Sequence, residues 1–281
     1  ICNSLTDKKS ESVLQENVSE LFVSRRFKSS GGIGNLSQLL REKYSGKKIS
    51  EENLVECFNK DDIRIYTGAF QTQFDRAVIE GFSGIINAKS PEEALYYTGS
   101  FRVLAAHRRG IRGLESVNDY IISLLRRKNL IGHSGRFYSR IPIMVQKNDY
   151  SLNLFNGDTG ILWNNGNEIR AYFYDSEDQK NIRSFPPDMI SFFEPSFAMT
   201  VHKSQGSEFN SVLFMLPENT SPILSIELFY TALTRAKEKF VVFGEEKLLF
   251  ESLNKKIIRK SGLRDALLKK ENGSVQYDLF Q

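Results

Sequence analysis

Thr200-Val201-His202-Lys203-Ser204-Gln205-Gly206-Ser207-Glu208-Phe209 and, further along, Tyr230-Thr231-Ala232-Leu233-Thr234-Arg235-Ala236-Lys237 are the two stretches that decide the fold. The first places hydroxyls, an imidazole, an amine and a glycine just before the apolar run 211–216, which is typical of loops that bind phosphate oxygens. In the second, Arg235 lies near the end of a predicted helix. There a guanidinium either complements the helix dipole or reaches a transferred phosphoryl group. A plain polar turn and a plain helix-end cation are the alternative interpretations.

The sequence around these stretches alternates helical and extended segments. Apolar periodicity predicts helices over 11–22, 71–86, 113–127, 225–235 and 245–253. Ser90 before Pro91 predicts one more helix start. Continuous apolar runs predict buried strands over 101–106, 211–216 and 240–243, and this alternation is typical of a parallel α/β sheet.

Between residues 136 and 195 the pattern changes to short extended runs separated by turns. Asn156-Gly157 and Asn165-Gly166 are typical hairpin turns, because the central residues of such turns need positive φ. Strands at this spacing predict a small β-barrel inserted into the α/β fold. We expect Trp163 and Tyr172 to pack in its core rather than stack on nucleic-acid bases.

The composition is that of an ordinary globular protein. The 281 residues are 40% hydrophobic and 26% charged with a net charge of +4, and they include no apolar run of membrane-spanning length and no secretory signal. We therefore expect a soluble, cytoplasmic protein without membrane contact. Cys2 and Cys57 are expected to be free thiols, and the three histidines are not spaced as metal ligands. Because the sequence starts at Ile1, we expect it to be a piece of a longer polypeptide.

Cations concentrate in one part of the chain. Residues 101–150 contain ten Lys and Arg but three acidic residues, a local excess of +7. Arg108, Arg109 and Arg112 are in this stretch, which is either an anion-facing surface or a solvated helix face.

The two opening stretches, in this order, resemble motifs V and VI of superfamily 1 DNA helicases, most closely those of the RecD group, the α subunits of bacterial exodeoxyribonuclease V. Three further stretches resemble the same group. Residues 21–27 with 31–34 are similar to its motif IV, residues 101–118 to a strand and basic turn of its second motor domain, and residues 148–160 to its SH3-like insertion. The resemblance covers about residues 12 to 265.

This resemblance implies a RecA-like second motor domain of the P-loop NTPase type. Its first part would span 1–135 and its second part 196–250, with an SH3-like barrel inserted at 136–195 and a C-terminal tail at 251–281.

The resemblance also implies roles for individual residues. Arg26 and Arg235 would be catalytic and reach the γ-phosphate of ATP, and Gln205, Gly206 and Glu208 would lie beside the nucleotide. The residues that bind single-stranded DNA would be Thr200, His202, Lys203, His107, Arg108 and Arg109. For Tyr230, core packing is the preferred interpretation.

The residues that would hold the nucleotide's phosphates and Mg²⁺ are missing from the sequence. Its nearest match to a Gly-Lys-Ser/Thr loop, Gly46-Lys47-Lys48, has a lysine where the hydroxyl is needed, and Asp61-Asp62 does not follow an apolar strand. We therefore expect ATP and Mg²⁺ to be bound mainly by another domain of a longer parent, and this chain alone to be inactive.

For the parent, the resemblance implies ATP-dependent 5′-to-3′ helicase activity within exodeoxyribonuclease V, in double-strand break repair and recombination. Its partners would be single-stranded DNA and RecB-like and RecC-like subunits. A stand-alone nucleic-acid-binding module, or a subunit-docking module without motor activity, is the alternative.

Overall fold

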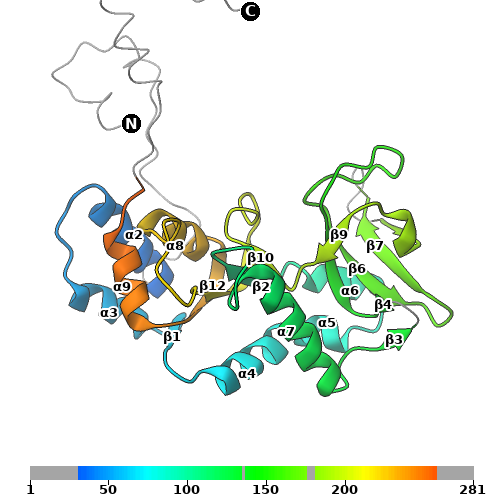
Figure 1. Cartoon of the computed structure of the whole chain (residues 1–281), viewed down its shortest axis with the longest axis horizontal. Helices are drawn as coiled ribbons and strands as arrows, with labels where there is room; N and C mark the ends of the chain where they lie inside the picture. Colours follow the sequence, from blue (N-terminus) through cyan, green and yellow to red (C-terminus); the bar gives the residue numbers. More distant parts are fainter. Residues whose placement is uncertain (1–30, 135–136, 176–180, 258–281) are drawn as a thin grey trace, which may run out of the picture. The chain divides into compact units, whose positions relative to one another are not determined.

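A five-stranded parallel sheet is the centre of the computed structural model, which describes residues 31–134, 137–175 and 181–257 (Figure 1). Every neighbouring pair of strands in this sheet is parallel. In spatial order the strands are β1 (Ile63–Tyr66), β12 (Ala236–Phe243), β11 (Phe209–Met215), β2 (Phe101–Ala105) and β10 (Ala198–Thr200). The predicted α/β class is therefore confirmed.

Helices cover both faces of the sheet. Successive strand residues alternate between two hydrophobic clusters, so that Val103 and Ala105 pack on one face and Leu104 and Ala106 on the other. The helices on the first face are α4 (Gln71–Gly81), α5 (Ser83–Asn87) and α7 (Leu114–Arg127), whereas α6 (Pro91–Tyr97) packs against residues 159–174. Those on the second face are α2 (Gly32–Tyr44), α3 (Glu51–Phe58), α8 (Ile226–Leu233) and α9 (Glu246–Asn254). None of the described helices is long and apolar enough to cross a membrane.

Most predicted helices and strands are found within a few residues of their expected positions, with two differences. The segment 71–86 is two helices and not one, because the chain breaks at Phe82, which ends α4 and precedes α5. Phe82 is buried there, edge-on to the rings of Phe101 and Phe197. Strand β12 starts at Ala236, four residues before the predicted strand. The predicted helix over 11–22 lies outside the described residues.

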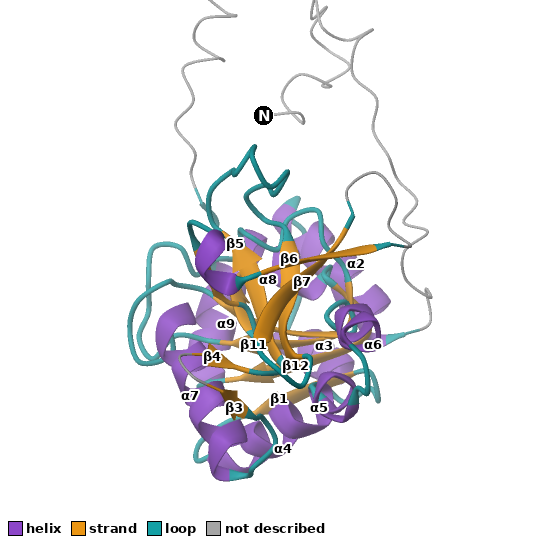
Figure 2. Ribbon diagram, turned by 90° about the vertical axis from the view of Figure 1, so that its right-hand side faces the viewer, coloured by secondary structure: helices purple, strands orange, loops and turns teal. Residues whose placement is uncertain are grey.

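The segment 141–195 forms a second, antiparallel sheet (Figure 2). Its order is β8 (Ile182–Phe185), β7 (Ile169–Tyr174), β6 (Thr159–Asn164), β5 (Ile141–Val145) and β9 (Phe193–Pro195). The turn predicted at Asn165-Gly166 joins β6 to β7, with Gly166 at φ +102°. A short pair, β3 (His133–Ser134) with β4 (Phe137–Tyr138), precedes the sheet, and the 3₁₀ turn η2 (Pro187–Met189) lies before β9.

This antiparallel sheet begins with β8 and ends with β9, and the pairing of its described strands does not join these two edges. The expected SH3-like barrel therefore remains a prediction.

The two sheets share one hydrophobic core. Ile143, Ile161 and Phe173 of the antiparallel sheet belong to the same buried cluster as Val103 and Leu213 of the parallel sheet. Residues 31–256 accordingly lie within a single compact unit. Trp163 is buried in this core and Tyr172 packs against it, as predicted.

Candidate functional site

The loop between β10 and β11, residues 201–208, is tightly folded. Its first turn is held by the backbone N–H of Ser204, which donates to Thr200 O at 3.1 Å, and by Ser204 Oγ, which donates to Val201 O at 2.7 Å. Thr200 Oγ1 accepts a hydrogen bond from the Lys203 N–H at 3.3 Å. Gly206 adopts φ +88°, a left-handed conformation that glycine takes without strain. The hydroxyls of this loop therefore shape it, and Ser204 is buried.

The same loop connects the side of the parallel sheet where its strands end, here called the carboxyl edge, to the side where they begin, here called the amino edge. It leaves β10 at Thr200, which pairs with Ala105 at the end of β2, and it enters β11, where Ser211 pairs with Phe101 at the start of β2. Four residues of strand separate these levels, about 13 Å. A single loop therefore links the carboxyl edge of the sheet to its amino edge.

Arg235 lies at the amino edge, between the end of α8 and the start of β12. Its guanidinium donates to Ser207 O at 3.0 Å and Ser204 O at 3.4 Å through Nη1, and to Thr231 O at 3.3 Å through Nε. Its carbonyl accepts from the Phe209 N–H at 2.9 Å. Arg235 thus ties the 201–208 loop to α8, and its half-buried cationic head is held at a defined place.

Glu208 lies at the same edge, next to Phe209 at the start of β11. Its carboxylate is 3.4 Å from Lys237 Nζ, and its side chain is 31% exposed, which leaves it open to solvent. Gln205 and Gly206 are also exposed. The structure therefore places the residues predicted to contact nucleotide along one loop together with Arg235.

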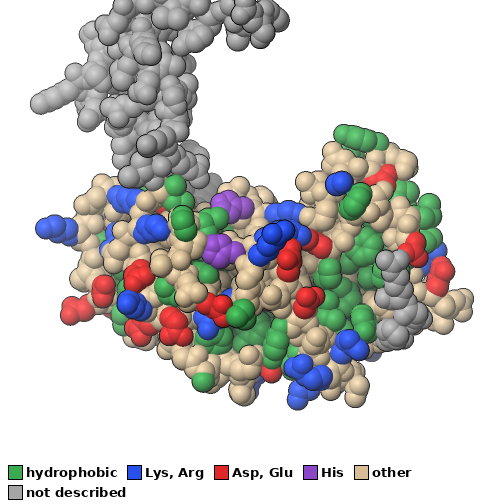
Figure 3. All heavy atoms as spheres, in the orientation of Figure 1, with side chains coloured by type: hydrophobic (Ala, Val, Ile, Leu, Met, Phe, Trp, Pro, Cys, Tyr) green, Lys and Arg blue, Asp and Glu red, His purple; other side chains and the backbone are tan. Residues whose placement is uncertain are grey.

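The six residues predicted to bind single-stranded DNA come together at the carboxyl edge. Thr200 ends β10, and His202 and Lys203 follow it. His107, Arg108 and Arg109 follow the neighbouring strand β2. His202 and Arg109 are exposed, and His107 is half-buried. Figure 3 shows histidine side chains close to Lys and Arg side chains on one face of the molecule.

A hollow of about 200 Å³ adjoins these residues. His107 and Arg109 line it on one side, and residues 217–221, which follow β11, line it on the other. The carboxyl ends of parallel strands are where α/β sheets bind ligands, so the position agrees with a binding role.

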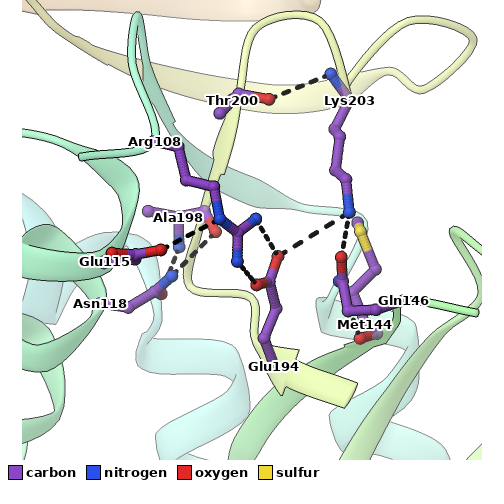
Figure 4. A network of polar contacts seen from close by, with 9 residues as sticks. All are labelled: Arg108, Glu115, Asn118, Met144, Gln146, Glu194, Ala198, Thr200 and Lys203. Carbon is purple, nitrogen blue, oxygen red and sulfur yellow. Dashed lines mark hydrogen bonds and ion pairs between the residues drawn. The ribbon is translucent and has the colours of Figure 1, made fainter. Parts of the chain in front are cut away.

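Arg108 is engaged by two carboxylates (Figure 4). Both of its Nη atoms donate to Glu194 of β9, and its Nε donates to Glu115 of α7 at 3.0 Å. The hydrogen bond to Glu194 raises the pKa of the Arg108 guanidinium. Arg108 is therefore part of an ion-pair network between the two sheets, although half of its side chain stays exposed.

Lys203 belongs to the same network. Its Nζ donates to Gln146 Oε1, just after β5, and lies 3.9 Å from Glu194 Oε1 (Figure 4). Two cations predicted to face DNA thus point toward residues of the antiparallel sheet in this structure.

Sequence reasoning missed Glu194, Gln146 and Asn118. Asn118 lies on the buried face of α7, and its amide pairs with both backbone groups of Ala198 in β10, at 2.9 and 3.2 Å. A polar residue next to Val117, at the position of a buried helix face, was the signal available for it. No local sequence pattern indicates the contacts of Glu194 and Gln146, because their partners come from distant segments.

Two further predictions concern single residues. Arg26 lies outside the described residues. Tyr230 is partly buried against the cluster around α8, in agreement with core packing.

Comparison with known proteins matches residues 195–243 to the family described as the UvrD-like helicase C-terminal domain. This segment contains the 201–208 loop, α8 and Arg235. The matched segment therefore includes both the loop that connects the two edges of the parallel sheet and the arginine that contacts this loop.

Relatives match a larger part of the chain. The RecBCD enzyme subunit RecD of Haemophilus influenzae is 31% identical over 271 residues, which cover 86% of this chain and 40% of that protein. The RecBCD enzyme subunit RecD of Mycolicibacterium smegmatis is 37% identical over 175 residues, covering 62% of this chain and 30% of that protein. The chain thus spans two fifths or less of the length of these two curated relatives.

Among solved structures, Pif1 helicase from Bacteroides in complex with ADP-AlF3 and ssDNA aligns with 90% of this chain and 57% of its own, at 14% identity and a TM-score of 0.45.

Proposed function

We propose, from the match of residues 195–243 to the UvrD-like helicase C-terminal domain and from the similarity of the chain to RecBCD enzyme subunits RecD, that this chain is the second, RecA-like motor domain of a superfamily 1 DNA helicase subunit. The observation that carries the proposal is the course of the 201–208 loop. Its first end contains His202 and Lys203, next to Thr200, and its other end contacts Arg235. A loop of this kind can link a DNA strand at one edge to a nucleotide at the other.

At the carboxyl edge the strand would contact two loops. Lys203, Arg108 and Arg109 supply cations for backbone phosphates, and Thr200, His202 and His107 supply short polar groups beside them. Binding of this kind depends on phosphate charge and not on base sequence, which suits a protein that moves along DNA.

At the amino edge, Arg235 would act as an arginine finger toward the γ-phosphate of ATP. The residues present fit this role: a guanidinium fixed by backbone carbonyls keeps its charge, and fixed charges stabilise a phosphoryl-transfer transition state. Glu208 would accept a hydrogen bond from the ribose, and Gln205 and Gly206 would lie beside the nucleotide. Arg26 would be a second arginine at the same phosphate.

ATP and Mg²⁺ would be bound mainly by a first motor domain, and this chain would complete that site. The parent would couple ATP hydrolysis to 5′-to-3′ translocation and unwinding. The antiparallel sheet would be an SH3-like module. By analogy with the RecBCD subunits, the parent would act with RecB-like and RecC-like subunits on broken DNA ends.

Single-strand binding by the chain tests the DNA side of this proposal. The affinity for a fluorescent oligothymidylate is measured by anisotropy over a series of salt concentrations. Each lost phosphate contact lowers the slope of log affinity against log salt by about 0.7 for a single strand. We expect this decrease for Lys203→Ala and for Arg109→Ala.

Lys89→Ala is the matched control, because Lys89 is an exposed cation that belongs to neither loop and lies between α5 and α6. It should leave the slope unchanged. Equal slopes for all variants and the wild type would contradict a strand-binding role for this edge.

A further inference from the structure

Glu194 belongs to the antiparallel sheet, but its carboxylate contacts side chains from two loops that follow strands of the parallel sheet. It is the middle residue of β9 in the antiparallel sheet, and it accepts hydrogen bonds from both Nη atoms of Arg108 (Figure 4). Lys203 Nζ lies 3.9 Å from its Oε1. One carboxylate therefore contacts two of the six residues proposed to bind the DNA strand.

This arrangement resembles phosphate recognition. A carboxylate and a phosphate each present two oxygens to the parallel N–H groups of a guanidinium, and arginine binds either one in the same forked geometry. The side chains of Arg108 and Lys203 are 48% and 33% exposed, and that of Glu194 is 20% exposed. A second anion can thus approach the two cations from solvent and compete with Glu194 for them.

The charges of the network cancel. Arg108 and Lys203 carry two positive charges, and Glu194 and Glu115 carry two negative ones. With all four paired, this part of the surface attracts a polyanion less than its cations alone would. If Glu194 leaves, one positive charge is uncompensated at the place where a phosphate is proposed to bind.

We propose, on the basis of the proposed function, that Glu194 takes the place of a DNA phosphate on Arg108 and Lys203 when no strand is bound, and that a bound single strand displaces it. Glu194 is a competitor built into the antiparallel sheet. Strand binding then breaks the ion pair between β9 and the two loops. By linkage, the factor by which strand binding weakens the contact between Glu194 and the two loops equals the factor by which this contact weakens strand binding.

The charge variant Glu194→Gln tests this inference in the full chain. Glutamine keeps the shape and can still accept a hydrogen bond from Arg108, but it no longer competes as an anion. We expect tighter binding of fluorescent oligothymidylate at low salt, by on the order of threefold, because one opposing charge is removed next to two exposed cations. The gain should shrink as salt increases.

Glu168→Gln is the matched control. Glu168 pairs with an arginine of the same antiparallel sheet, Arg170, at 2.8 Å, but it is not part of the network. It reports what the loss of any one negative charge does to binding. A double-mutant cycle with Arg108→Ala adds specificity, since the gain from Glu194→Gln should fall by at least half when Arg108 is absent.

The outcomes separate this inference from the function on which it rests. Suppose Arg108→Ala and Lys203→Ala weaken binding, but Glu194→Gln binds no tighter than Glu168→Gln. Displacement is then wrong and the strand-binding edge stands. If neither cation variant weakens binding, the edge does not bind DNA and the displacement of Glu194 fails with it.

Discussion

Arg102 of β2 is a buried cation whose observed partners are neutral. Its guanidinium donates to Ser196 O and Oγ, just before β10, and to Thr98 O after α6, and it lies 5.1 Å from the centre of the Phe209 ring. Burial lowers its pKa to about 10. The arginine thereby connects the end of the antiparallel sheet to β2, and its charge is desolvated in doing so.

The lowered pKa of Arg102 makes stability depend on pH. Above about pH 10 the folded chain loses this proton before the unfolded chain does, so the unfolded chain binds more protons and the free energy of unfolding rises with pH. We compare the free energies of unfolding of the wild type and Arg102→Met. From pH 9 to pH 11 we expect that of the wild type to gain about 1 kcal/mol relative to the variant. Urea unfolding at both pH values measures it. A difference that stays constant with pH would contradict the desolvated charge.

Single residues differ in how well their roles follow from sequence. Thr200, His202 and Arg235 were predicted as site residues because they belong to short patterns of characteristic spacing. Glu194 and Asn118 were missed because each acts on a residue about eighty positions away, and only the fold brings the pairs together. Their contacts arise from sheet topology, which a local pattern does not contain.

At the scale of elements, the start of α2 depends on a distant carboxylate. Gly31 provides no side-chain cap, and instead Asp62, just before β1, accepts hydrogen bonds from the backbone N–H groups of Gly32 at 2.9 Å and Ile33 at 3.0 Å. A Cβ on Gly32 would lie 2.5 Å from Asp62 Oδ1, so glycine permits this approach. The sequence around the helix does not indicate this cap, because Asp62 is thirty residues away.

Removing this cap should destabilise the protein. We expect Asp62→Ala to lower the free energy of unfolding by about 1 to 2 kcal/mol, the usual effect of losing a helix N-cap. Asp61→Ala is the control, because Asp61 is adjacent and exposed and no hydrogen bond to α2 is observed for it. Chemical denaturation measures the free energy of unfolding of both variants. Equal decreases for the two variants would show that the carboxylate of Asp62 does not cap α2.

At the scale of the whole molecule, the parallel and antiparallel sheets form one compact unit. Their buried residues belong to one hydrophobic cluster, and Asn118, Arg102 and Glu194 add polar contacts where the chain passes from one sheet to the other. The sequence predicted an inserted β segment from its turns. It did not reveal that the insertion and the α/β sheet share a core, because that depends on how the sheets pack.

Thermal unfolding should therefore be a single transition. Trp163 is the only tryptophan and lies in β6, so its fluorescence reports on the antiparallel sheet, whereas the helical circular dichroism signal reports on the α/β part. We expect the two midpoints to coincide. Midpoints several degrees apart would mean that the insertion unfolds independently.

In the proposed mechanism one domain joins a strand-binding edge to a phosphate-facing arginine. Single-stranded-DNA-stimulated ATP hydrolysis by the full-length protein measures this coupling. Wild type is compared with Arg235→Ala at saturating ATP, with Arg41→Ala, an exposed arginine of α2, as the control. Loss of an arginine finger lowers turnover by about 10³ to 10⁵. We predict a decrease of at least about a hundredfold for Arg235→Ala, with DNA binding retained and Arg41→Ala unaffected. Unchanged turnover in Arg235→Ala would contradict the arginine-finger role and leave Arg235 as a residue that only joins a loop to a helix.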